Sequence, residues 1–116
     1  MATGKLDDDA KRDVRKEFGE AVNMSASALR TWLGTDESRS VGDKGGADEE
    51  STGHEMGRHI VDLRGKHAAD LDDEDYARMR KVVGYVHRHL AQRPKGDVTE
   101  TKWRYSLMNW GHDPLK

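Results

Sequence analysis

Cysteine is absent from this 116-residue sequence, and proline occurs only twice. Without cysteine the chain forms no disulfide bond, thiolate zinc site or iron–sulfur cluster, and it has no cysteine nucleophile. No apolar run approaches the roughly 20 residues that a membrane-spanning helix needs, and the N-terminus lacks the apolar core of a signal peptide. We therefore expect a cytoplasmic protein that has no membrane partner.

Apolar residues are also scarce. Hydrophobic residues make up 34% of the chain and charged residues 36%, and the mean hydropathy is -1.00. A chain of this length forms one domain with one small core, so the apolar surface must be concentrated in a few amphipathic elements. Trp32, Trp103 and Trp110 are the largest side chains available for burial, and we predict that they lie in the core.

Apolar residues recur at three- and four-residue spacings, and no segment alternates with period two for long enough to form a strand. We predict an all-α fold of about five helices in a small bundle. The predicted helix caps are Asp7 to Asp9, Ser25, Thr52 with Glu55, Asp72 or Asp73, and Thr99 or Thr101. The expected organisation is a polar tail (1–10), a helix-turn-helix-like pair (11–34), a flexible linker (35–51) and a helical core region (52–116).

The linker prediction rests on composition. Residues 35–51 consist mainly of Asp, Glu, Ser and Gly, and Val41 is the only large apolar residue among them. Such a segment buries too little surface to offset the entropy lost on ordering. We therefore expect it to be mobile.

Residues 18–33 match the spacing of the DNA-binding helix-turn-helix motif. The template positions for a small residue, a turn residue and two apolar residues hold Gly19, Asn23, Leu29 and Trp32. Asn23 would form the turn, because asparagine tolerates the left-handed conformation that ends helices. The second helix would enter the major groove, and the residues that it would present there are Ala26, Ser27, Arg30 and Thr31. An ordinary corner between two helices needs the same apolar spacing.

Charge is distributed unevenly along the chain. Residues 1–52 hold 8 bases and 12 acids, whereas residues 76–96 hold 6 bases and no acid. At 100° per residue, one face of the long helix expected there, opposite its apolar stripe, presents Arg78, Lys81, Tyr85, Arg88 and Gln92. Arg93 and Lys95 extend this basic ridge, and Lys102 and Arg104 can join it from the last helix. A phosphate backbone suits such a ridge, but a solvated helix face has the same appearance.

The six histidines do not have metal-binding spacing. His54 and His59 lie five residues apart, about 140° from each other on a helix, and His87 and His89 lie about 200° apart. Neither pair matches the spacing of the His-Glu-x-x-His zinc motif. The sequence also lacks a nucleophile elbow, a phosphate loop and a convincing carboxylate pair. We therefore expect no metal, no cofactor and no catalytic residue.

Four stretches resemble a known family: VNMSASALRTWLGTDESRSVG, ESTGHEMGRHIVDL, DYARMRKVVGYVHRHLAQRP and TKWRYSLMNWGHDPLK. The family consists of small bacterial and fungal proteins catalogued as a domain of unknown function, and some members are labelled DNA-binding proteins. The resemblance covers roughly residues 14–116, and WRYSLMNWGHDPLK is its most specific part. It implies no catalytic residue and is consistent with the basic ridge.

These observations favour a non-enzymatic protein that binds double-stranded nucleic acid. The expected nucleic acid is DNA, bound mainly through its phosphates, and the expected location is the nucleoid. The expected phosphate contacts are Arg78, Lys81, Arg88, Arg93 and Lys95, and the expected base-edge contacts are Arg30 and Thr31. The alternative is a protein-interaction module of stress or nucleoid physiology, in which exposed aromatic residues and the glycine-rich linker meet a partner protein or a second copy of the chain.

Overall fold

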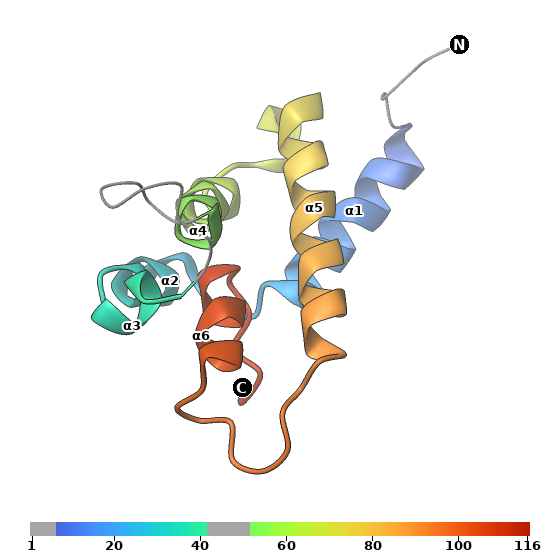
Figure 1. The fold of residues 1–116 in the computed structure, drawn as a ribbon. Helices are drawn as coiled ribbons and strands as arrows, with labels where there is room; N and C mark the ends of the chain where they lie inside the picture. The colour runs from blue at the N-terminus through green and yellow to red at the C-terminus, as the bar shows by residue number, and fades with distance from the viewer. Residues whose placement is uncertain (1–6, 42–51) are drawn as a thin grey trace.

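The computed structural model describes residues 7–41 and 52–116. These residues form six α-helices and a short 3₁₀ helix, and they contain no strand, so the predicted all-α class is confirmed (Figure 1). The α-helices are α1 (Asp8–Ala21), α2 (Ala26–Leu33), α3 (Asp36–Arg39), α4 (Thr52–Arg64), α5 (Asp73–Leu90) and α6 (Lys102–Asn109), and the 3₁₀ helix is Ala68–Asp70.

Four of the helices begin at side-chain caps that the sequence predicts. Asp7 accepts a hydrogen bond from the Ala10 amide at 2.7 Å, and Ser25 and Thr101 cap α2 and α6 in the same way. Asp72 opens α5 with a complete capping box, in which its side chain accepts from the Asp75 amide and the Asp75 side chain accepts from the Asp72 amide. Each cap of this kind stabilises a helix by about 1 kcal/mol. The predicted caps of these helices are therefore confirmed.

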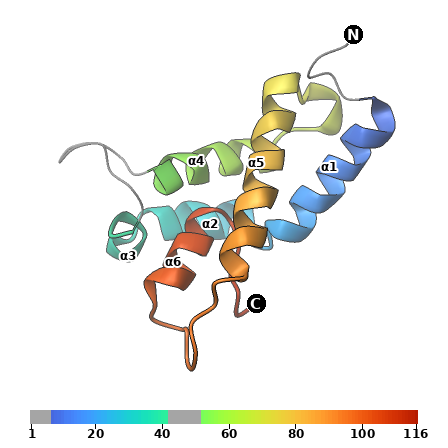
Figure 2. The same ribbon diagram turned by 45° about the vertical axis from the view of Figure 1, so that its right-hand side comes forward.

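The helices pack as two pairs joined by α6. Helix α1 packs along α5, and α2 packs along α4, while α6 contacts both pairs (Figures 1 and 2). Four helices contribute to the most deeply buried large apolar side chains, which include Leu29, Ile60, Val82, Val86 and Leu107. Trp103 and Trp110 are buried as predicted, and Trp32 is half-buried against the same core.

The structure does not show the packing expected between the two helices of a DNA-binding helix-turn-helix. The two helices are present, but α1 and α2 share almost no contact and diverge from their connection (Figure 2). Each has its apolar face against a different partner, α5 for α1 and α4 for α2. In the described part of the chain only glycines have positive φ, so Asn23 does not adopt the left-handed conformation that the prediction assigned to it.

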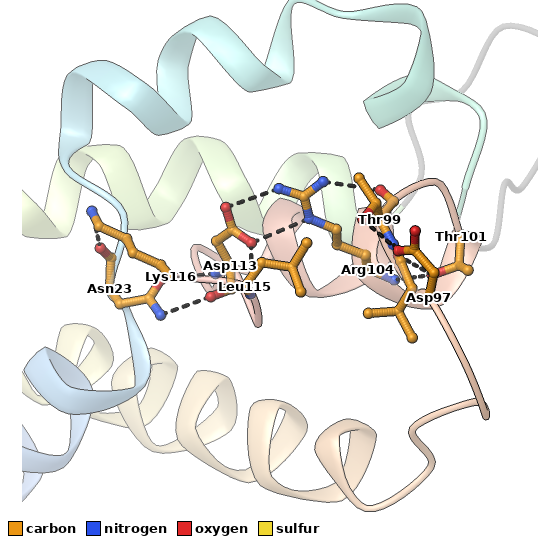
Figure 3. A network of polar contacts seen from close by, with 9 residues as sticks. Asn23, Asp97, Thr99, Thr101, Arg104, Asp113, Leu115 and Lys116 are labelled. Atoms are coloured by element: carbon orange, nitrogen blue, oxygen red, sulfur yellow. Dashed lines mark hydrogen bonds and ion pairs between the residues drawn. The ribbon is translucent and has the colours of Figure 1, made fainter.

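The C-terminal segment instead fixes the connection between α1 and α2 (Figure 3). The Asn23 Nδ2 group donates to the Asp113 carbonyl at 3.0 Å, and the Asp113 amide donates to Asn23 Oδ1 at 2.7 Å. The Met24 amide donates to the Gly111 carbonyl at 3.1 Å. Gly111 has φ +80°, and a Cβ there would lie 2.9 Å from Val22 Cγ1. Glycine is required at this position for both reasons.

Helix α4 approaches α2 and α6 closely at a glycine. A Cβ on Gly57 would lie 2.6 Å from both the Asn109 carbonyl oxygen and Leu33 Cδ2. Contacts this short do not occur between real side-chain and backbone atoms, so a side chain at this position would force the helices apart. Gly57 therefore sets the distance between α4 and its two neighbours.

The flexible-linker prediction is wrong for residues 35–41. Thr35 caps α3 by accepting from the Ser38 amide at 3.1 Å, and both Ser38 and Val41 are buried. The Ser38 hydroxyl donates to Asn109 Oδ1 at 2.5 Å, and Asn109 Nδ2 donates to the Ser38 carbonyl at 3.0 Å. Buried, paired polar groups of this kind hold α3 against α6. The rest of the predicted linker, 42–51, lies outside the described residues.

Candidate nucleic-acid interface

Four of the predicted phosphate contacts are exposed on α5 and the loop that follows it. Lys81 and Arg88 lie on the helix, and Arg93 and Lys95 lie in the loop. None of the four has a carboxylate partner among residues 7–41 and 52–116. We call these four residues the α5 cationic surface.

Arg78 does not belong to this surface. Its guanidinium is half-buried and lies 3.4 Å from the Glu74 carboxylate. Arg78 lines a hollow between α2, α4 and α5, and Arg30 lines the same hollow from α2. The predicted ridge is therefore divided, because the fold turns its first residue toward α4. Thr31 is exposed on α2.

Tyr85 also departs from the predicted ridge. It is half-buried, and its ring stacks on Trp110 with centroids 4.0 Å apart and on His89 with centroids 5.2 Å apart. Burial raises the pKa of the Tyr85 hydroxyl above its ordinary value. The helix face that the pattern assigned to solvent is thus covered here by α6. Gln92, which the pattern placed on the same ridge, is exposed just beyond the end of α5.

The stack continues to the loop and positions one cation of the α5 cationic surface. The centroids of the His89 and Trp103 rings lie 6.1 Å apart, and the Arg93 guanidinium carbon lies 5.4 Å from the centroid of the Trp103 ring, as a cation–π pair. Trp103 Nε1 donates to the His89 carbonyl at 2.7 Å. These contacts fasten the end of α5 to the start of α6, so Arg93 is held at a defined place.

His89 is neutral in this stack at neutral pH. Burial lowers the pKa of its imidazole below 6.5, although the hydrogen bond to the Trp103 carbonyl opposes this shift. Because a carbonyl only accepts, His89 Nε2 carries the proton and donates it across the 3.2 Å contact. The ring therefore contributes packing and one hydrogen bond rather than positive charge.

Arg104 does not join the α5 cationic surface. Its Nε and Nη2 groups donate to the two carboxylate oxygens of Asp113 at 3.2 and 3.1 Å, and Nη1 donates to the Thr99 carbonyl (Figure 3). Burial raises the pKa of Asp113, but the hydrogen bonds from Arg104 and from the Leu115 amide outweigh it, so the pKa lies below its ordinary value. Arg104 thus holds the C-terminal segment. Lys102 is exposed at the start of α6.

The hollow that contains Arg30 and Arg78 has a volume of about 490 Å³. One of its lining residues is Asp75, which is buried and accepts from Lys66 Nζ at 2.8 Å and from the Asp72 amide at 3.1 Å. The hydrogen bond from Lys66 lowers the pKa of Asp75 below its ordinary value of 3.8. One carboxylate therefore closes the capping box of α5 and also ties α5 to the end of α4.

Acid is expected to weaken this tie. Because the pKa of Asp75 is depressed in the folded protein, its stabilisation is complete above pH 3.8 and is lost as the pH falls through the folded-state value. The Asp75→Asn variant should be less stable than wild type at pH 7 and should lose less stability between pH 4 and pH 2. Urea denaturation across this range measures both effects. Parallel pH profiles for the two proteins would contradict the assigned role of Asp75.

The histidines found in the described residues do not gather. His54 Nε2 lies 2.7 Å from the Leu33 carbonyl, and His112 Nδ1 lies 2.7 Å from the Ala21 carbonyl. The described part of the chain contains no group of three or more histidine and carboxylate side chains placed to hold a metal ion. Nor is any helix in it long and apolar enough to cross a membrane.

A family model described as "Protein of unknown function (DUF3140)" matches residues 17–108. The chain belongs to this family. The match confirms the resemblance to a small family of unknown function, and it includes α2, α4 and α5, which carry Arg30, Arg78 and the helical part of the α5 cationic surface. No curated protein and no solved structure matches the chain significantly.

Proposed function

We propose that this protein binds double-stranded DNA without catalysis, through the phosphate backbone. The observation that carries the proposal is the α5 cationic surface: Lys81, Arg88, Arg93 and Lys95 are exposed without a carboxylate partner in the described residues. They lie in the stretch 76–96, which contains no acidic residue. Arg78 pairs with Glu74, just outside this stretch, but Lys81, Arg88, Arg93 and Lys95 remain available to an external anion.

The spacing of these cations suits a nucleic-acid strand. Lys81 and Arg88 are seven residues apart on a continuous helix, which corresponds to about 10.5 Å along its axis. This is roughly the axial rise of three nucleotides on one DNA strand. Arg93 and Lys95 continue the cationic surface beyond the helix end, where Trp103 holds Arg93. Phosphate contacts of this type give affinity and register without reading the base sequence.

The base-edge contacts expected of Arg30 and Thr31 are not part of this proposal. Their assignment depended on a helix-turn-helix arrangement, and α1 and α2 do not pack against each other in that way. Arg30 lies at the α2–α4–α5 hollow together with Arg78. We therefore expect the protein to show little preference among duplex sequences.

A protein-interaction module is the less favoured function. That alternative requires exposed aromatic or apolar side chains, but Leu115 is the only large hydrophobic residue exposed in the described ranges. Trp103 and Trp110 are buried, and Trp32 donates its Nε1 proton to Asn109 at 2.8 Å. The aromatic residues are therefore engaged within the fold.

The proposal is tested by titrating a fluorescent random-sequence duplex with the full chain and following fluorescence anisotropy. Binding is expected at about 50 mM salt, and four phosphate contacts would weaken it about 10²-fold between 50 and 200 mM salt. Absence of binding at about 50 mM salt would contradict the proposal. So would an affinity that does not change with salt, which is the behaviour of an apolar interface.

A further inference from the structure

We propose that the hollow between α2, α4 and α5 binds a phosphate monoester. The hollow has a volume of about 490 Å³, within the usual range of small-ligand sites. Its charged and titratable lining residues are Arg30, His59, Asp62, Lys66, Asp75 and Arg78. This site adjoins the α5 cationic surface but shares no residue with it, and the proposal does not depend on DNA binding.

The charges in the hollow leave two guanidinium groups for a ligand. Lys66 and Asp75 neutralise each other through a 2.8 Å ion pair. Asp62 lies near the same lysine and contributes to raising the Lys66 pKa. Arg30, in contrast, is exposed and has no partner among the described residues. Arg30, on α2, is therefore the main cation of the hollow that has no close partner within the described residues.

Arg78 is held by only a weak internal contact. The Glu74 carboxylate that it meets at 3.4 Å is itself 75% exposed, and exposed pairs of this kind contribute little. His59 adds a ring nitrogen to the lining, and its own carboxylate neighbour, Glu55, is 3.9 Å away and 59% exposed. Both groups can turn to a ligand at small cost.

Two arginines on different helices favour a doubly charged anion with several acceptor oxygens. A guanidinium group donates two parallel hydrogen bonds to phosphate or carboxylate, but a single carboxylate carries only one negative charge. A phosphate monoester carries between 1.5 and 2 negative charges at pH 7, with three acceptor oxygens. Val61 and Leu63 also line the hollow, so the organic part of an ester finds apolar surface beside the arginines.

A cation is a poorer occupant of the same hollow. The Asp75 carboxylate already accepts from Lys66 and from the Asp72 amide. Asp62 then remains as the single acidic group facing two arginines and a histidine. This arrangement repels a divalent cation and attracts an anion.

The experiment is an NMR titration of the ¹⁵N-labelled full chain with inorganic phosphate, with uridine 5′-monophosphate and with acetate at equal ionic strength. The phosphate compounds should shift the amide signals of Arg30, His59 and Arg78 saturably, and acetate should not. Arg30→Gln and Arg78→Gln should each weaken binding about tenfold or more, as loss of a charge-assisted hydrogen bond implies. Arg80→Gln is the matched control, because Arg80 is exposed on α5 and does not line the hollow.

Two results would overturn the proposal: no saturable shift at these residues, or an equal loss of binding in Arg80→Gln.

A second comparison identifies the source of the phosphate. If the site takes the end of a nucleic acid, a duplex with 5′-phosphates should bind more tightly than one with 5′-hydroxyls, and Arg30→Gln should remove the difference. If it takes a free monoester, the two duplexes should bind equally while the mononucleotide still binds. In either case Arg30→Gln should leave the salt-dependent binding of 5′-hydroxyl duplex unchanged, so failure of this proposal is distinguishable from failure of DNA binding.

Discussion

Replacing Trp103 with alanine should lower the free energy of unfolding by about 3 to 5 kcal/mol, the usual cost of truncating a buried tryptophan. Trp103 is only 8% exposed. The substitution removes its stacking on His89 and the Nε1 hydrogen bond to the His89 carbonyl. A domain of this size has a total stability of only about 5 to 15 kcal/mol, so much of it would be lost. Urea denaturation followed by circular dichroism measures the change.

Two further variants make this result specific. Trp103→Phe retains an aromatic ring but removes the Nε1 hydrogen bond to the His89 carbonyl, which keeps the Gln92 amide as a donor, so it should cost only about 0.5 to 1.5 kcal/mol. Leu115→Ala alters the exposed C-terminal leucine and should change stability by no more than about 0.5 kcal/mol. If Trp103→Ala is as stable as wild type, α6 does not pack on the end of α5 as described.

Replacing Lys81, Arg88 and Lys95 together with glutamine should reduce the affinity for duplex DNA by about 10²- to 10³-fold at about 0.1 M salt, if each residue neutralises one phosphate. The three side chains are exposed and make no ion pair among the described residues, so the melting temperature should barely change. Arg93 is left in place because it contacts Trp103.

The matched control replaces Lys16, Arg39 and Arg64 with glutamine. These cations are exposed on α1, α3 and α4, and their removal changes the net charge by the same amount. This control should retain affinity within a fewfold of wild type. An equal loss in both triple variants would mean that the α5 cationic surface acts only through the net charge of the chain.

The parts of the fold that depend on local signals were predictable from the sequence. A cap such as Ser25 or Asp72 acts within three residues of itself, and an apolar stripe identifies a helix wherever its partner lies. The all-α class and the starts of four helices follow from these signals. Helix α3 was not predictable although Thr35 caps it locally, because its burial depends on the contact between Ser38 and Asn109, which is 71 positions away.

The candidate site was predictable only in part, for a similar reason. A helical projection assumes one buried face, but α5 is packed against α1 and also meets α6. Tyr85 therefore stacks on Trp110, and Arg104 pairs with Asp113, although the pattern assigned both to a ridge. The hollow is formed by residues from three helices. No spacing within one segment indicates that Arg30 and Arg78 meet there.

The most direct test of phosphate binding by the α5 cationic surface is the slope of log affinity against log salt concentration for duplex DNA. Each phosphate contact contributes about 0.9 to this slope. The Lys81, Arg88 and Lys95 triple variant should therefore have a slope about 2.7 units shallower than wild type, while the Lys16, Arg39 and Arg64 control should run parallel to wild type. Equal slopes for the two triple variants, or a wild-type slope near zero, would contradict the proposed function.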